Sequence, residues 1–116
     1  MEEKTSDEME MAKKKNEKGK EEKKEEIIEK IDKYYKLTTE ALKKAKEAPE
    51  NINIGSARDD FLDMIERYVK DSVHFKKNGD FLNSFAALNY AHGWLDAGAR
   101  LGLWDINDSR LFAGVG

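Results

Sequence analysis

The 116-residue chain contains no cysteine, only one proline and no long apolar run. Without cysteine it can form neither a disulfide framework nor a thiolate metal site. A membrane-spanning helix needs about 18 consecutive apolar residues, and no stretch approaches that length. The start of the chain is too charged for a secretory signal. These absences predict a cytoplasmic protein with no membrane partner.

The chain also lacks an excess of one charge. Charged residues make up 39% of the sequence, yet the formal net charge is only -3. Acidic and basic residues are interspersed, so no broad positive field attracts nucleic acid, and a nucleic-acid partner is not expected. No glycine-rich phosphate loop, HExxH motif or nucleophile elbow is present, so we expect no cofactor.

Apolar residues recur at steps of three and four over three stretches, which predicts three helices. The first is expected from about residue 23 to 48 and ends before Pro49, which cannot continue a helix. The other two form a hairpin over residues 58–102 with a tight turn at Asn78-Gly79-Asp80. Asn78 or Gly79 can take the left-handed conformation that ends the second helix, Asp80 is the next N-cap, and Gly102 is the expected C-cap of the third helix. Matched lengths and short connections favour an all-α, antiparallel, up-down three-helix bundle.

The two ends of the chain differ in composition from the bundle predicted for residues 22–104. Residues 1–21 are low-complexity Glu and Lys with almost nothing to bury. Such a segment cannot offset its ordering entropy, so a disordered charged tail is expected. Residues 105–116 include Leu111 and Phe112 and are expected to pack on the bundle or on a second copy.

The helix expected from Phe81 to about Leu101 carries alanine and glycine on several faces. An interior glycine costs roughly 0.5–1 kcal/mol relative to alanine, which a helix tolerates where backbones pack closely. We therefore predict that this helix is central and sheltered by its neighbours. Its small residues, among them Ala87, Ala91 and Gly98, also offer a surface for self-association.

A first polar arrangement that could carry chemistry lies on the second helix. Arg67 and His74 are seven residues apart and share a face, with Asp71 nearby. Their spacing is similar to that in small helical ribonucleases of the higher eukaryote and prokaryote nucleotide-binding class. There the arginine holds phosphate and the histidine does acid–base work. Alternatively, His74 is a half-exposed histidine beside surface ion pairs.

A second arrangement lies on the third helix, where His92, Asp96 and Arg100 follow at steps of four. Asp96 could orient His92 and Arg100 could contact an anion, or His92 is a hydrogen-bonded interior histidine. In the antiparallel hairpin, His92 lies roughly 13 Å along the axis from His74. The two histidines cannot then share one ion, and no metal site is predicted.

Tyr90 and Trp94 lie one helical turn apart with Gly93 between them. Two interpretations stay open. The pair either forms an aromatic binding shelf beside the glycine notch or packs against the first helix. With Arg100 and Asp71, these aromatic residues are the candidate binding residues.

The runs GDFLNSF and YAHGWLDAGARLGLW, with the rest of the hairpin and more loosely the first helix, resemble the archaeal domain of unknown function 357. The resemblance covers about residues 25–104. It implies a small all-helical cytoplasmic domain from an archaeon and assigns no activity. It places these residues at motif positions: Asp71, His74, Gly79, Asp80, Tyr90, Gly93, Trp94, Asp96 and Arg100.

No complete catalytic set is present, so the sequence favours a non-enzymatic helical interaction domain over an enzyme. We expect it to self-associate through the small-residue face or the carboxyl-terminal segment, or to bind another protein. The competing hypothesis is a nucleotide- or RNA-acting helical domain that uses one of the two polar arrangements.

Overall fold

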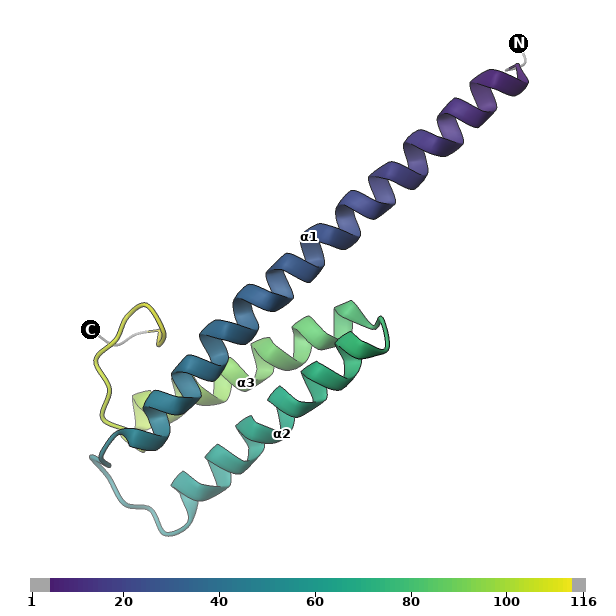
Figure 1. Ribbon diagram of the computed structural model, residues 1–116. Helices are drawn as coiled ribbons and strands as arrows, with labels where there is room; N and C mark the ends of the chain where they lie inside the picture. The colour runs from purple at the N-terminus through teal and green to yellow at the C-terminus, as the bar shows by residue number, and fades with distance from the viewer. Residues whose placement is uncertain (1–4, 114–116) are drawn as a thin grey trace.

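The computed structural model describes residues 5–113 of the chain. Three helices run up, down and up: α1 spans Ser6–Glu47, α2 spans Ala57–Lys77 and α3 spans Phe81–Leu101 (Figure 1). These described residues contain no strand, and the predicted all-α antiparallel bundle is confirmed. None of the three helices combines the length and the apolar character that crossing a membrane requires.

The central position predicted for the third helix is also confirmed. α3 packs along both α1 and α2, whereas α1 and α2 contact each other only sparingly (Figure 1). Leu88, Ala91 and Leu95 of α3 are fully buried, and Ile31 of α1 and Ile65 of α2 are almost fully buried. Each large apolar side chain buried in this way contributes on the order of 1.5–3 kcal/mol to stability.

Local capping signals form the α2–α3 turn as the sequence predicts. Gly79 has a φ of 76°, a left-handed conformation that glycine adopts at little steric cost. Asp80 then caps α3, because its carboxylate accepts a hydrogen bond from the backbone N–H of Asn83 at 3.2 Å. At the far end, Gly102 ends α3 with a φ of 89°.

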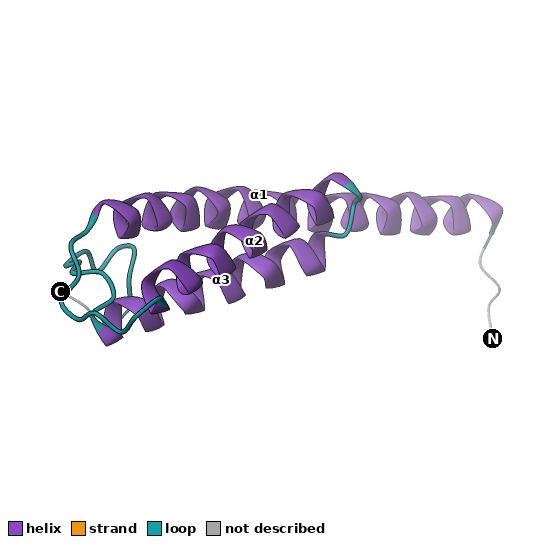
Figure 2. Ribbon diagram, turned by 90° about the horizontal axis from the view of Figure 1, so that it is seen from below, coloured by secondary structure: helices purple, strands orange, loops and turns teal. Residues whose placement is uncertain are grey.

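The amino-terminal part of α1 differs from the prediction. Residues 6–21, which we expected to be disordered, are helical and continuous with the rest of α1 (Figure 2). The helix begins with a capping box: the Thr5 hydroxyl accepts from the Glu8 N–H, and the Glu8 carboxylate accepts from the Thr5 N–H, both at 3.2 Å. Residues 1–4 of the predicted tail lie outside the described residues.

We call residues 6–26 of α1 the shaft. All of them except Gly19 are exposed, which agrees with the prediction that this stretch buries almost nothing. The shaft extends past the α2–α3 turn (Figure 2) and lengthens the molecule, whose longest dimension is 71 Å. Helix there depends on its cap and on neighbouring Glu and Lys side chains rather than on burial.

The carboxyl-terminal segment folds back over one end of the bundle, and we call residues 103–113 the strap. Trp104, Leu111 and Phe112 are almost completely buried, and the Trp104 indole N–H donates to the carbonyl oxygen of Leu95 at 3.0 Å. These apolar side chains are covered by their own chain, so they do not offer a docking surface to a second copy. Residues 114–116 lie outside the described residues.

The interior glycines of α3 do not serve backbone-to-backbone packing. A Cβ on Gly98 would lie 2.0 Å from Cζ2 of Trp104, so this glycine makes room for an indole. At Gly93 the same construction meets no atom within 4 Å. Ala87, Ala91 and Gly98 are buried by the chain itself, so in this fold they cannot be the self-association surface that we predicted.

Candidate functional site

Four aromatic side chains form a continuous row along the contact between α2 and α3. Tyr68 and Tyr90 meet edge to face with ring centroids 4.6 Å apart, and Phe61 meets Trp94 in the same way at 4.8 Å. Tyr90 and Trp94 join the two pairs at 6.4 Å. Edge-to-face contacts suit the charge distribution of aromatic rings and hold them in place. We call these four residues the aromatic shelf.

A hollow of about 340 Å³ opens beside the shelf. It is lined by Phe61, Asn89, Tyr90, Gly93, Trp94 and Ala97. Gly93 keeps the hollow open because it has no side chain, and Tyr90 is 54% exposed above it. Rings and small residues accept an apolar side chain, while the Asn89 amide can bond to a neighbouring backbone.

This geometry agrees with the shelf interpretation, and the rings that Tyr90 and Trp94 contact belong to the second helix rather than the first. Their ring partners, Tyr68 and Phe61, both belong to α2. Loss of contact with water raises the pKa of Tyr68, and the neighbouring Tyr90 and Asp71 raise it further. Tyr68 therefore stays neutral at physiological pH and keeps its hydroxyl proton.

The side chain of His92, on α3, lies between α1 and the strap. Its Nε2 donates to the carbonyl oxygen of Leu111 at 2.5 Å, because a carbonyl can only accept. In the neutral ring Nδ1 is then the acceptor, and the hydroxyl of the fully buried Thr38 donates to it at 3.2 Å. Both ring nitrogens are therefore engaged in hydrogen bonds within the fold, which agrees with the interior-histidine interpretation. Neither nitrogen is free to exchange a proton with a substrate.

Asp96 and Arg100, which were grouped with His92 in the second polar arrangement, have different surroundings. One oxygen of Asp96 accepts from the backbone N–H of Ala113 at 2.9 Å and lies 3.8 Å from Nε2 of His92. Asp96 therefore fastens the end of the strap. Arg100 is exposed. It lines an open depression together with Asp96, Ala97, Leu101 and Ala113.

Arg67 and His74 both lie on the surface of α2 with partners from the same region. The Arg67 guanidinium pairs with the Asp63 carboxylate at 2.9 Å, and the Asn78 amide donates to Nε2 of His74 at 3.1 Å. Asp71 is exposed as well. None of the hollows described here is lined by Arg67 or His74, so the arrangement agrees with the surface ion-pair interpretation.

A second hollow, of about 400 Å³, lies between α1 and α2. Ile31, Tyr35 and Val73 contribute apolar surface to it. Asp32 of α1 and Lys76 of α2 also line it, and they join its two walls through an ion pair of 2.5 Å. This hollow is therefore bridged by charged side chains, whereas the hollow beside the aromatic shelf is lined by rings, small residues and one amide.

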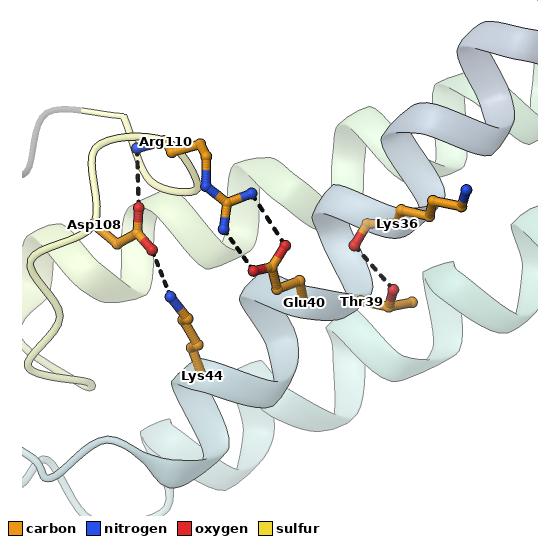
Figure 3. A network of polar contacts seen from close by, with 6 residues as sticks. All are labelled: Lys36, Thr39, Glu40, Lys44, Asp108 and Arg110. Atoms are coloured by element: carbon orange, nitrogen blue, oxygen red, sulfur yellow. Dashed lines mark hydrogen bonds and ion pairs between the residues drawn. The ribbon is translucent and has the colours of Figure 1, made fainter.

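Ion pairs with α1 hold the strap in place (Figure 3). Arg110 contacts both carboxylate oxygens of Glu40, at 2.5 and 3.2 Å, and Lys44 lies 2.6 Å from Asp108. The hydrogen bond from Arg110 lowers the pKa of Glu40, and the hydrogen bond from Lys44 lowers the pKa of Asp108. Sequence reasoning missed these pairs because no local periodicity links an exposed helix residue to a distant loop.

Arg58 is another residue that sequence reasoning missed. Its guanidinium donates to the carbonyl oxygens of Leu103 at 2.8 Å and of Ala45 and Lys46 at 3.1 Å. The last carbonyls of a helix lack intrahelical partners, and a cation there complements the helix dipole of α1. One signal in the sequence could have identified it. Arg58 is a basic residue in the first turn of α2, where the helix dipole favours anions, so a partner outside that helix was to be expected.

These elements define a small all-α domain built on a helical hairpin with an added first helix. The chain belongs to the family described as protein of unknown function (DUF357), whose model matches residues 33–104. That range contains the aromatic shelf, His92 and the whole hairpin, whereas the shaft precedes it and most of the strap follows it. No curated protein and no solved structure matches the chain.

Proposed function

We propose that this protein is a non-enzymatic helical interaction domain and that the aromatic shelf is its docking surface for another protein. The observation that carries this proposal is the exposed Tyr90 ring beside the open notch at Gly93. Tyr and Trp dominate the energetic centres of protein interfaces, since they bury a large area for little lost conformational freedom. Of the four shelf residues, Tyr90 is exposed and the other three are partly buried, so the shelf offers one accessible ring supported by three others.

The chemistry of the hollow selects one kind of partner segment. Phe61, Trp94 and Tyr90 provide ring surface for one apolar side chain, and Ala97 leaves space at the rim. The Asn89 amide can both donate to and accept from a peptide backbone. We therefore expect a protein segment with a protruding aliphatic or proline side chain and an accessible peptide group beside it.

The variant Gly93→Gln tests this proposal because it fills the notch from a position where the fold has space. Wild-type and variant chains are immobilised and exposed to an extract of the native host, and bound proteins are quantified by mass spectrometry. We expect the variant to retain the circular dichroism spectrum of the wild type. It should bind the specific partner at least about tenfold less, the equivalent of roughly 1.4 kcal/mol.

Ala86→Gln is the matched control. Ala86 is also a small, exposed residue of α3, two turns before Gly93 and outside the lining of the hollow. Retention by Ala86→Gln together with loss by Gly93→Gln supports the shelf. Equal capture of the same proteins by all three chains would show that the shelf is not the docking surface.

The alternative function, a nucleotide- or RNA-acting domain, has weaker support. Both nitrogens of His92 are engaged, and Arg67 is paired with Asp63. RNA cleavage and nucleotide binding by His74→Ala and His92→Ala compared with wild type distinguish the two functions. Activity in the wild type that is lost in a folded variant would favour the alternative.

We further propose a cytoplasmic location and an archaeal host. The chain has no cysteine and therefore none of the disulfides that stabilise many small secreted domains, and the motifs in the hairpin resemble archaeal proteins. Immunodetection after fractionation of host cells tests the location, and recovery mainly in the membrane or secreted fraction would contradict it.

A further inference from the structure

The hollow between α1 and α2 extends from the surface to the core of the bundle. Its volume is about 400 Å³, and small-molecule sites have volumes of roughly 300–1,000 Å³. Ile31 and Ser72 line it and are each 1% exposed, so they form its floor. The Ser72 hydroxyl is engaged with that of Ser84 at 3.2 Å. Tyr35 and Val73 add a ring and a branched side chain to the walls, so the interior suits an apolar group.

The charged residues of the lining are the ones in contact with solvent. Lys76 and Asp32 pair with each other at 2.5 Å, and their side chains are 39% and 51% exposed. Lys77 is also exposed and makes no ion pair with any residue that the structure describes. Two ammonium groups therefore stand beside one carboxylate at the opening, which leaves one positive charge without an opposite partner.

We propose that this hollow binds a small amphipathic anion, a molecule with one short hydrocarbon chain and one carboxylate. The chain lies against Ile31, Tyr35 and Val73, and the carboxylate pairs with the ammonium group of Lys77. Apolar surface below and a positive charge at the opening thus match the two ends of one ligand. This site does not involve the aromatic shelf, and it is independent of the function proposed above.

The extent of the lining limits the size of the ligand. The lining residues fall within 31–35 of α1 and 72–77 of α2, roughly 8–9 Å of each helix at a rise of 1.5 Å per residue. A partner helix or an extended peptide would need a longer groove. The hollow therefore suits a small molecule that lies between the two helices.

Asp32 sets the affinity for such an anion, because it competes for one of the two lysines. Its carboxylate holds the ammonium group of Lys76, so only Lys77 is available to the ligand. Removal of the Asp32 charge releases Lys76 as a second cationic partner. The site should therefore bind an anion more tightly when this native ion pair is lost, the opposite of what a loss of fold stability would produce.

A ligand in this position also ties α1 to α2, which contact each other only sparingly in the fold. Because it binds the folded chain and contacts both helices, it should raise the midpoint of thermal unfolding in a concentration-dependent way. This shift provides a second readout beside direct binding.

A titration of the full chain followed by nuclear magnetic resonance provides the first test, with octanoate as the probe. We expect saturable shifts of the amide signals from residues 31–35 and 72–77. Acetate lacks the chain and octylammonium carries the opposite charge, so each should bind at least about tenfold more weakly. Absence of saturable shifts with octanoate, shifts confined to residues 89–97 of the shelf, or equal binding of octylammonium would overturn the proposal.

Two variants provide the second test, and they should change the affinity for octanoate in opposite directions. Lys77→Glu should weaken binding about tenfold, and Asp32→Asn should strengthen it about twofold to fivefold, as expected for solvent-exposed ion pairs. Lys70→Glu is the matched control. It makes the same charge change at an exposed position of α2 two turns before Lys77, outside the lining, and should bind like the wild type.

The variants change exposed side chains, so each should retain the circular dichroism spectrum of the wild type. Equal weakening by Lys77→Glu and Lys70→Glu would show that net charge rather than this site governs binding, and would overturn the proposal. Weaker or unchanged binding by Asp32→Asn would do the same. Neither result bears on the aromatic shelf, which is tested at Gly93.

Discussion

The indole of Trp104 occupies the space that a side chain at Gly98 would need. A Cβ at position 98 would lie 2.0 Å from Cζ2 and 2.4 Å from Cη2 of that ring. The indole N–H donates to the carbonyl oxygen of Leu95, one turn before Gly98 on α3, so the ring is held against α3. The start of the strap is thus anchored by Trp104, whose ring fits against α3 only because Gly98 has no side chain.

Gly98→Ala should therefore destabilise the protein although alanine favours helix. Displacing a packed ring costs about 1–3 kcal/mol, more than the gain of up to about 1 kcal/mol from helix propensity. Gly93→Ala is the matched control, and it should stabilise the protein by about 0.5–1 kcal/mol because it meets no neighbour. Urea unfolding followed by circular dichroism measures the change in the free energy of unfolding for both variants. If both variants were stabilised, or both destabilised, this account would be refuted.

His92→Ala should cost about 2–3 kcal/mol, since it leaves the buried hydroxyl of Thr38 and the carbonyl of Leu111 without their shared partner. His74→Ala, at an exposed position of α2, should change stability by less than about 0.5 kcal/mol. The free energy of unfolding in urea measures both. Comparable values for the two histidines would contradict the role assigned to His92.

Local chemistry explains which parts of the fold were predictable. The turn at Gly79, the cap at Asp80 and the end of α3 at Gly102 depend on residues within one helical turn of each other, and their structure matches the prediction. The central position of α3 followed from small residues on several faces. In contrast, the shaft is helical because of capping and charge spacing, which a burial argument undervalues.

The candidate site was predictable in its residues but not in its contacts. Helical spacing singled out Tyr90 and Trp94, yet it cannot say which neighbouring helix each face of α3 meets. The same spacing could not show that His92 lies under the strap, because no period relates Leu111 to α3. Long-range partners such as Glu40 and Arg110 need coordinates for the same reason.

The strap should loosen in acid. The pKa of Glu40 and the pKa of Asp108 are both lowered in the folded protein by their hydrogen bonds to Arg110 and Lys44. A lowered carboxyl pKa contributes stability above the unfolded value, about 4, and that contribution is lost as the pH falls through the folded value. Tryptophan fluorescence in a Trp94→Phe background, which leaves Trp104 as the reporter, should shift between about pH 5 and about pH 2.

The neutral double variant Glu40→Gln/Asp108→Asn is the control for the acid transition. It removes both titrating carboxyls while it keeps their size, so the strap should be looser at neutral pH and less sensitive to acid. The side chains of both ion pairs are partly exposed to solvent, so added salt should weaken the pairs in the wild type. An identical acid transition in wild type and double variant would assign it to other groups.

Ser84→Ala should cost more than Ser72→Ala, although both serines are buried in the same contact of α2 with α3. The hydroxyl of Ser84 donates to the carbonyl oxygen of Ser72 at 2.8 Å, so in the hydroxyl pair, 3.2 Å apart, Ser72 must be the donor. Removing the Ser84 hydroxyl leaves a buried donor and a carbonyl without this partner, at a cost of about 1–2 kcal/mol. Removing the Ser72 hydroxyl leaves Ser84 bonded to the carbonyl and should cost less than about 1 kcal/mol. Urea unfolding of the two variants tests this direction of the hydrogen bonds. If Ser72→Ala destabilised the protein more than Ser84→Ala, the assigned donors would be wrong.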